Sequence, residues 1–294
     1  MKHDFMRFAE EVRSQIEKVT GKDVRLHPVK KNNGVVLNGI TILTSESKVS
    51  PTIYIDKWFR EYEEGEAIED IADEIIRLND ESAHPKEIDI SFFSNYEEVK
   101  KNLAYKLINA DMNVQLLQEV PHKRFLNLAV VCFCEIRDEI IGDGSILIKN
   151  EHLKLWGLDD NVVIQDAMEN AQKIFEADFI NIIEVLKERY HHPENMLDIE
   201  YPMWVLTNKR RLYGAGVLLY DNQLEQIAEK VQSDFIILPS SVHEVLVTPM
   251  LEKNIDYLVS MVREINEEQL ILEERLADNI YIYHRETKSL EMVS

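Results

Sequence analysis

The chain has 294 residues and is 45% hydrophobic, so it is long enough to bury a large core in one or two domains. Its formal net charge of −21 opposes binding to nucleic acid or anionic lipid, because both are themselves negatively charged. The longest apolar run, residues 126–134, has the length of a strand and is far shorter than the roughly 20 residues that span a bilayer. We therefore expect a folded globular protein without a membrane span. Its charge suits a basic protein partner, a nucleic-acid mimic or simply a solvated acidic surface.

The N-terminal segment is predicted to form a helix followed by a hairpin. Residues 4–20 carry the charged, amphipathic pattern of a helix rather than that of a signal peptide, and Gly21 ends this pattern. Strands are expected over 24–29 and 35–43, and the Asn33-Gly34 pair between them is typical of a tight turn.

An acidic segment follows, and its charges lie on a helical pattern. Residues 61–81 contain ten acidic residues and one basic residue. The apolar residues of this segment recur at helical spacing: Ile68, Ile71, Ile75, Ile76 and Leu78. A disordered acidic tail would lack that stripe, so we interpret the acids as the solvent face of a packed helix over 67–78.

A strand–strand–helix layout recurs along the chain. In three places a short β-rich run is followed by Asp or Asn, whose side chain can accept from the free N–H groups of a starting helix. These residues are Asp56, Asn150 and Asp221. The strands expected upstream of the three runs are 35–43, 126–136 and 203–208. A looser fourth copy has strands over 235–238 and 244–248 and a helix over 251–265.

The rest of the chain completes an α+β pattern, with repeated strand–strand–helix units and helices packed on a mixed or antiparallel sheet. Further helices are expected over 96–110 and over 162–190, the latter broken near Ala177. Residues 279–284 and 289–293 are predicted to form a terminal hairpin. The segments 84–95 and 191–202 have the composition of connectors. The first connector divides an N-terminal α+β part, residues 1–84, from a C-terminal α+β part, residues 95–294.

Cysteine usage points to a reducing compartment. The two cysteines, Cys132 and Cys134, lie two positions apart on one strand face. Two cysteines at positions i and i+2 of one strand do not readily form a disulfide with each other. We therefore predict buried free thiols in a cytoplasmic protein.

The segment PSSVHE, from Pro239, is the strongest candidate for catalysis. A serine nucleophile needs a base within hydrogen-bond reach, and on extended chain Ser241 and His243 would point to the same side. Ser240 and Glu244 lie next to them. The G-x-S-x-G elbow is absent, however, and serines after a proline also serve as a plain turn between two strands. We favour the turn.

Other polar groups are candidates for binding. His152 and Trp156 are four residues apart and would share a helix face, where packing of the ring on an aromatic side chain is the simpler interpretation. His122 and Arg124 belong to a basic spot that could receive an anion or pair with a surface acid. Asn208 begins the basic run NKRR in an expected turn.

Common metal and nucleotide motifs are missing from the sequence. It contains neither H-E-x-x-H nor C-x-x-C, and it has no Walker loop and no G-x-G-x-x-G. We therefore predict no metal site and no cofactor.

Seven segments together resemble a bacterial family that is catalogued as a domain of unknown function. They are NNGVVLNGITI, SPTIYIDKWFREYEEG, YKLINA, VPHKRFLNLAVVCFC, ILIKNEHLKLWG, PMWVLTNKRRLYGAGVLLY and DFIILPSSVHEVLV, and they span most of the chain. The resemblance implies a cytoplasmic bacterial protein with one architecture from end to end. It implies no activity, cofactor or catalytic residue.

Three functions are compatible with these patterns. We favour a non-catalytic binding or protein-interaction protein that uses its acidic surface or a groove. The first alternative is a hydrolase or small-molecule enzyme with Ser241 and His243 in its pocket. The second is an acidic nucleic-acid mimic that inhibits a nucleic-acid-binding protein.

Overall fold

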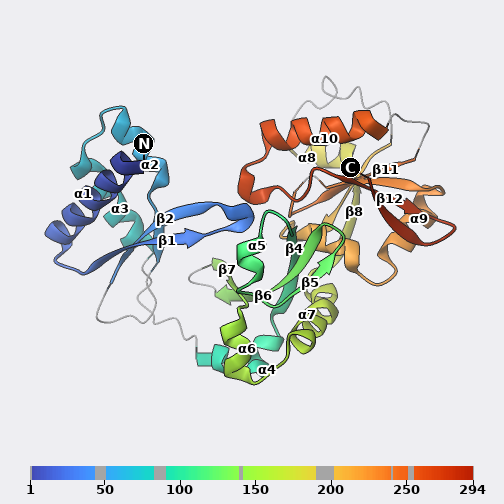
Figure 1. Ribbon diagram of the computed structural model, residues 1–294, viewed down its shortest axis with the longest axis horizontal. Helices are drawn as coiled ribbons and strands as arrows, with labels where there is room; N and C mark the ends of the chain where they lie inside the picture. The colour runs from blue at the N-terminus through green and yellow to red at the C-terminus, as the bar shows by residue number, and fades with distance from the viewer. Residues whose placement is uncertain are drawn as a thin grey trace. The chain divides into compact units, whose positions relative to one another are not determined.

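The computed structural model describes residues 2–43, 51–82, 91–138, 142–189, 202–239, 241–250 and 255–293. The chain forms two compact units (Figure 1). Unit 1 comprises Met1–Phe93 with Arg137–Gly144, and unit 2 comprises Ser94–Ile136 with Ser145–Ser294. Most of both predicted connectors, residues 83–90 and 190–201, lies outside the described residues, as does Ser240.

Unit 1 combines one small antiparallel sheet with three α-helices. Its strands, in sheet order, are β1 (Val24–Lys30), β2 (Val36–Ile42) and β3 (Thr52–Tyr54). Its helices are α1 (Lys2–Thr20), α2 (Asp56–Glu63) and α3 (Ile68–Ser82). The short helix η1 (Asn32–Gly34) lies between β1 and β2, and η2 (Ser91–Ser94) lies where the chain passes from unit 1 into unit 2.

Local signals predicted the start of unit 1 correctly. Gly21 follows α1 with a φ of 66°, a left-handed conformation that ends a helix without strain in glycine. Asn33 and Gly34 have φ values of 56° and 71° and turn β1 into β2, closed by the Lys31 N–H donating to the Val35 carbonyl at 2.7 Å. The predicted helix and hairpin are therefore confirmed.

The core of unit 1 lies between α1, α3 and the sheet. Phe8, Val12 and Ile16 recur every four residues on α1 and are fully buried, and Ile71 and Ile75 of α3 belong to the same cluster. Burying each such side chain contributes about 1.5–3 kcal/mol. The acids of α3 thus lie on the outer face of a packed helix, as the stripe predicted, whereas Glu61, Glu63, Glu64 and Glu66 lie at the end of α2 and in the loop that follows it.

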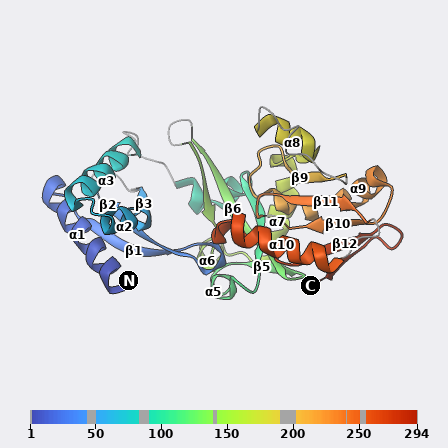
Figure 2. The ribbon, with the colours of Figure 1, turned by 90° about the horizontal axis from the view of Figure 1, so that it is seen from above.

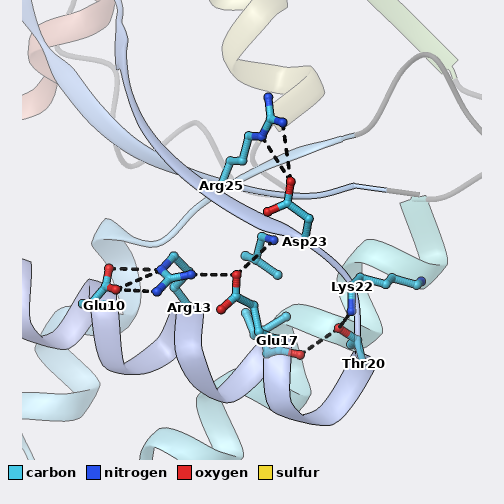
Figure 3. A network of polar contacts seen from close by, with 9 residues as sticks. Glu10, Arg13, Glu17, Thr20, Lys22, Asp23 and Arg25 are labelled. Carbon is cyan, nitrogen blue, oxygen red and sulfur yellow. Dashed lines mark hydrogen bonds and ion pairs between the residues drawn. The ribbon is translucent and has the colours of Figure 1, made fainter. Parts of the chain in front are cut away.

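A polar network on the outside of α1 ties this helix to β1 (Figure 3). Arg13 pairs with Glu10 and, at 2.6 Å, with Glu17. Glu17 also accepts from the Val24 backbone N–H at 3.4 Å, so the helix end and the strand start share one carboxylate. Thr20 accepts from the Lys22 N–H at 3.2 Å within the same turn.

Unit 2 contains two antiparallel sheets. In the first, β4 (Leu103–Asn109), β6 (Leu128–Asp138) and β5 (His122–Phe125) are neighbours in that order, and β7 (Gly142–Leu147) also pairs with β6. The second has six strands, in the order β13 (Ser289–Val293), β12 (Ile280–His284), β10 (Phe235–Leu238), β11 (Val245–Pro249), β9 (Trp204–Asn208) and β8 (Ala177–Asn181).

Helices cover these sheets (Figure 1 and Figure 2). They are α4 (Tyr96–Lys100), α5 (Val114–Leu117), α6 (Asn150–Trp156), α7 (Asp160–Ile174), α8 (Ile182–Arg189), α9 (Gln223–Val231) and α10 (Ile255–Gln269), with η4 (Gly214–Leu219) and η5 (Leu272–Glu274). Leu258, Val259 and Val262 of α10 pack on the six-stranded sheet through Ile236 and Ile282. The predicted α+β class with antiparallel sheets is confirmed, as is the terminal hairpin β12–β13.

One helix prediction in unit 2 is wrong, and a second, whose two helical parts α7 and α8 are confirmed, missed the strand between them. Only Tyr96–Lys100 is helical in the segment 96–110, because Leu103–Asn109 forms β4 and pairs along its whole length with β6. Most of β4 is buried on both faces, so its apolar residues do not alternate as in a half-exposed strand. The break predicted near Ala177 is itself a strand, β8, which pairs with β9 at the sheet edge.

The third strand–strand–helix unit is also wrong. Residues 217–219, expected as a strand, belong to η4, which passes close to its neighbours: a Cβ on Gly214 would overlap Thr207 and the His243 carbonyl. The other three predicted strand–strand–helix units are present in the structure as β2–β3–α2, β6–β7–α6 and β10–β11–α10.

The polar residues of these units do not cap their helices. Asp56 follows β3 and accepts from both Asn38 nitrogen atoms, at 2.7 and 2.8 Å. Asn150 begins α6 and donates to the Gln118 carbonyl at 3.0 Å, and Asp221, which follows η4, accepts from Gln172 at 3.2 Å. Each side chain thus connects the start of its helix to a neighbouring segment of the chain. The prediction that these side chains cap the helices is therefore wrong.

The cysteines are buried and free, as predicted. Cys132 and Cys134 lie on β6 without a disulfide. Burial raises the pKa of both thiols to about 12, since an apolar surrounding disfavours the thiolate. Within the described ranges no helix is long and apolar enough to cross a membrane.

Candidate functional site

The segments NKRRLYGAG and PSSVHEV meet in unit 2 beside the end of β9. The Thr207 hydroxyl donates to the His243 carbonyl at 2.8 Å, and the Ala215 N–H donates to the Val242 carbonyl at 3.3 Å. The Val242 N–H in turn donates to the Glu274 carbonyl of η5 at 2.9 Å. Three segments distant in the sequence are thereby held together by hydrogen bonds to the backbone.

Ser241 and His243 are neighbours here, but their side chains do not form a nucleophile–base pair. The Ser241 hydroxyl oxygen accepts from the His243 backbone N–H at 3.0 Å. The His243 Nδ1 atom accepts from the Tyr213 backbone N–H at 3.2 Å, which leaves the ring proton on Nε2 in the neutral form. The basic nitrogen is therefore occupied by the backbone, and the serine hydroxyl shapes a turn. This geometry does not support the hydrolase alternative.

The His243 ring belongs to a layered stack. It lies on the Tyr213 ring with centroids 5.5 Å apart and planes inclined by 13°. The Lys106 ammonium lies over the Tyr213 ring, 4.4 Å from the centroid of that ring. A cation over an aromatic face is attracted by the ring quadrupole, so the Tyr213 ring is stabilised by Lys106 as well as by His243.

Asn208 shapes the turn that presents Tyr213. Its amide donates to the Leu212 carbonyl at 2.7 Å and accepts from the N–H groups of Arg210 and Leu212. Arg211 and Tyr213 both have a φ of 52°, an uncommon conformation for residues with side chains. Asn208 is only 2% exposed and its hydrogen bonds hold this strained turn in place.

Each cation of the NKRR run pairs with an acid. Lys209 contacts Glu176 and Arg211 contacts Glu188, each at 2.6 Å, and these pairs lie at the surface. Arg210 contacts Glu135, which is 1% exposed. The run therefore neutralises carboxylates of its own unit, and Arg210 compensates a buried charge.

The remaining candidates occupy other places in unit 2. His152 accepts at Nδ1 from the Lys149 N–H at 3.1 Å, and its ring lies 5.9 Å from that of Trp156. Burial lowers the pKa of His152. His122, on β5, contacts the Val120 carbonyl at 3.1 Å, and Arg124 pairs with Asp111 at 3.3 Å.

A surface hollow of about 540 Å³ lies elsewhere, at one end of the six-stranded sheet. It is lined by Gln232, Ser233, Asp234, His284, Arg285, Glu286 and Thr287, and thus by none of the residues that the sequence singled out as candidates. Across the described ranges, no group of three or more His, Cys, Asp or Glu side chains is arranged to hold a metal ion.

Unit 1 carries a different kind of site, which we call the α2–α3 acidic surface. Its members are the exposed carboxylates from the last turn of α2 to Asp73 of α3, none of which has a Lys or Arg within ion-pair distance among the described residues: Glu61, Glu63, Glu64, Glu66, Glu69, Asp70 and Asp73. Other acids of the segment have partners. Glu74 accepts from the Trp58 ring at 2.9 Å and lies 3.9 Å from Lys57, and Glu81 lies 3.9 Å from Arg77.

The helix dipole acts against part of this surface. Glu61 and Glu63 lie in the last turn of α2 and Glu64 is its C-cap residue, where the free carbonyl groups favour cations. Arg60 is the single basic residue of that turn. These three carboxylates therefore do not stabilise the helix that carries them.

Sequence reasoning found part of these sites. The acidic segment and the residues Asn208, Ser241 and His243 were recognised, whereas Tyr213, Lys106 and Glu135 were not. The GAG run at Gly214 was a usable signal, because closely spaced glycines mark a place where backbone segments approach each other.

Comparison with known proteins identifies a family. No curated protein and no solved structure matches the chain. The model of the Family of unknown function (DUF5688) matches residues 5–285, which is nearly the whole chain. The chain therefore belongs to the DUF5688 family.

Proposed function

We propose that this protein is a non-catalytic interaction protein whose α2–α3 acidic surface binds a basic protein. The observation that carries the proposal is the set of seven exposed carboxylates that have no Lys or Arg within ion-pair distance among the described residues. Like charges placed close together on a helix repel one another, and Glu61, Glu63 and Glu64 also oppose the dipole of α2, so these three carboxylates do not stabilise the fold. A partner that brings Lys and Arg side chains relieves the repulsion.

The chemistry of the surface favours a protein over a metal ion as the occupant. The carboxylates are spread over the end of α2, the following loop and α3, and they do not converge on one point. A basic surface can meet such a spread with several guanidinium or ammonium groups. Complementary charge also speeds association, so binding should weaken as salt is added.

A bacterial, cytoplasmic setting is part of the proposal. The free, buried thiols of Cys132 and Cys134 support a reducing compartment. Nucleic-acid-binding proteins are one class of basic partner, so the mimic alternative makes the same surface act as a competitor of nucleic acid.

The test compares two charge-matched variants of the tagged full-length protein. One carries Glu61→Gln, Glu63→Gln and Glu64→Gln on the proposed surface. The control carries Glu264→Gln, Glu267→Gln and Glu268→Gln on α10, where the carboxylates are also exposed. Both remove three negative charges.

Capture from cell extract followed by mass spectrometry should recover a basic protein with the wild type and the control, and lose it with the α2 variant. Recovery of the same proteins by all three chains would contradict the proposal. Recovery of no basic protein by the wild type would contradict it equally. Displacement of the captured protein by added DNA or RNA would favour the mimic.

A further inference from the structure

His284 lies between two carboxylates at the end of the six-stranded sheet. Its Nδ1 atom is 3.1 Å from Asp234 Oδ2, and its Nε2 atom is 3.2 Å from Glu291 Oε2. An ionised carboxylate only accepts hydrogen bonds, and a neutral imidazole has a single N–H. Both contacts are therefore satisfied only when the ring carries a proton on each nitrogen.

The three residues come from three segments. Asp234 lies in the connection between α9 and β10, His284 ends β12, and Glu291 is in β13. β13 is an edge strand whose sheet neighbour is β12. Protonated His284 thus fastens the edge strand and the connection to the same point.

The hollow of about 540 Å³ lies against this contact. Asp234 and His284 are two of its lining residues, and the turn Arg285–Thr287 supplies others. The Arg285 N–H donates to Asp234 at 2.9 Å, and the Arg285 guanidinium donates to the Gln232 carbonyl at 3.2 Å. His284 and Arg285 therefore hold the same wall of the hollow against Asp234.

We propose that Asp234, His284 and Glu291 form a pH-sensitive latch, which holds the turn after β12 and the edge strand β13 to the α9–β10 connection while His284 is doubly protonated. Loss of one ring proton breaks one of the two contacts. The edge strand β13 then opens more often, while β12 stays paired with β10.

The direction of the pH dependence follows from both partners. Asp234 and Glu291 raise the pKa of His284 above its ordinary 6.5, so the stability it contributes is complete below that value and is lost as pH rises through the raised pKa. The Arg285 N–H, and next His284, lower the pKa of Asp234 below its ordinary 3.8. The contribution of Asp234 is present above 3.8 and is lost as pH falls through the lowered value. The latch is therefore closed between these two limits.

Other charged groups surround the latch. They are Arg285, Glu286 and Lys288 of the turn, Glu225 and Glu229 of α9, and Tyr283 of β12. Lys288 pairs with Glu225 at 2.5 Å. Among these residues and the latch itself, His284 is the sole imidazole, so it is the group that changes charge near neutral pH.

The first test is an NMR titration of the histidine rings in the full chain. His284 should titrate above 6.5, and Asp234→Asn or Glu291→Gln should each lower its midpoint. His152, whose pKa burial lowers, serves as the internal reference with the opposite shift. A His284 midpoint at or below 6.5 would overturn the latch.

The second test is hydrogen exchange of residues 289–293 from about pH 6 to about pH 9, corrected for the intrinsic pH dependence of exchange. The opening constant should rise about tenfold for each unit by which the measured pKa of His284 is raised. His284→Gln should remove this rise, and His152→Gln should leave it unchanged. An equal rise in wild type and His284→Gln would show that another group is responsible.

Discussion

The Tyr213 backbone N–H donates to His243 Nδ1 at 3.2 Å while the two rings stack at 5.5 Å. This residue pair therefore connects the turn after β9 to the segment before β11. This contact also occupies the histidine nitrogen that a serine nucleophile would need. The polar residues that first suggested catalysis hold the fold together here.

The contacts of Ser241 and His243 with the backbone predict that both residues stabilise the folded protein. Ser241→Ala should lower the free energy of unfolding by about 1 kcal/mol, since one backbone N–H loses its acceptor. His243→Ala should lower it by about 2 kcal/mol, because the Tyr213 N–H is left unpaired and the ring stack is lost. Urea unfolding of the full chain measures both, with Ser260→Ala on exposed α10 as control, expected to be within about 0.5 kcal/mol of wild type. Values for Ser241→Ala and His243→Ala that match the control would refute this role.

The buried ion pair between Arg210 and Glu135 predicts that replacing Arg210 destabilises the protein much more than replacing Arg211. Arg210→Met should cost about 3 kcal/mol, because Glu135 is 1% exposed and would lose the guanidinium that pairs with it. Adding Glu135→Leu should recover most of that loss, since the uncompensated charge is gone. Arg211→Met, which breaks the surface pair with Glu188, should cost less than about 1 kcal/mol. Equal losses for Arg210→Met and Arg211→Met would contradict the importance of burial.

The α2–α3 acidic surface predicts a gain in stability when its charges are removed. Neutralising Glu61, Glu63 and Glu64 by Gln should raise the free energy of unfolding by about 1 kcal/mol in total at low salt, because each carboxylate opposes the helix dipole. Replacing Asp159 and Asp160 by Asn, at the start of α7, should have the reverse effect. Thermal unfolding at low and high salt measures both. A loss of stability in the α2 variant would mean that these residues have a structural role.

The cysteines predict slow reaction with thiol reagents in the native protein. With a pKa of about 12, only about one thiol in ten thousand is ionised at about pH 8. Labelling should require transient opening of unit 2 and become rapid in denaturant. Mass spectrometry after timed exposure to a thiol reagent provides the measurement. Rapid native labelling of either cysteine would show that β6 is accessible.

Elements with strong local signals were predicted well. Gly21, the Asn33-Gly34 turn and the spacing of Ile71 and Ile75 each depend on a few neighbouring residues. Turn and cap conformations follow from φ preferences, and an amphipathic helix follows from its period. Both kinds of signal are complete within one short segment.

Elements defined by distant partners were not predicted. Leu103–Asn109 is a strand because β6 pairs with it and because both faces are covered, and neither condition is visible in its own residues. The same holds for Ala177–Asn181 beside β9. In η4, the close approach of Thr207 and His243 to Gly214 decides the local conformation.

The sequence by itself determined the α+β class, the acidic helix face, the buried thiols and the family, because composition and short-range spacing carry that information. Only the tertiary structure decided what the polar motifs do. The side chains of Ser241, His243 and Asn208 could have faced a cleft or the backbone. Their positions depend on contacts with Thr207, Tyr213 and Glu274, which no motif around the serine indicates. A buried polar group must find a partner wherever the packed chain supplies one, and that place is a property of the whole fold.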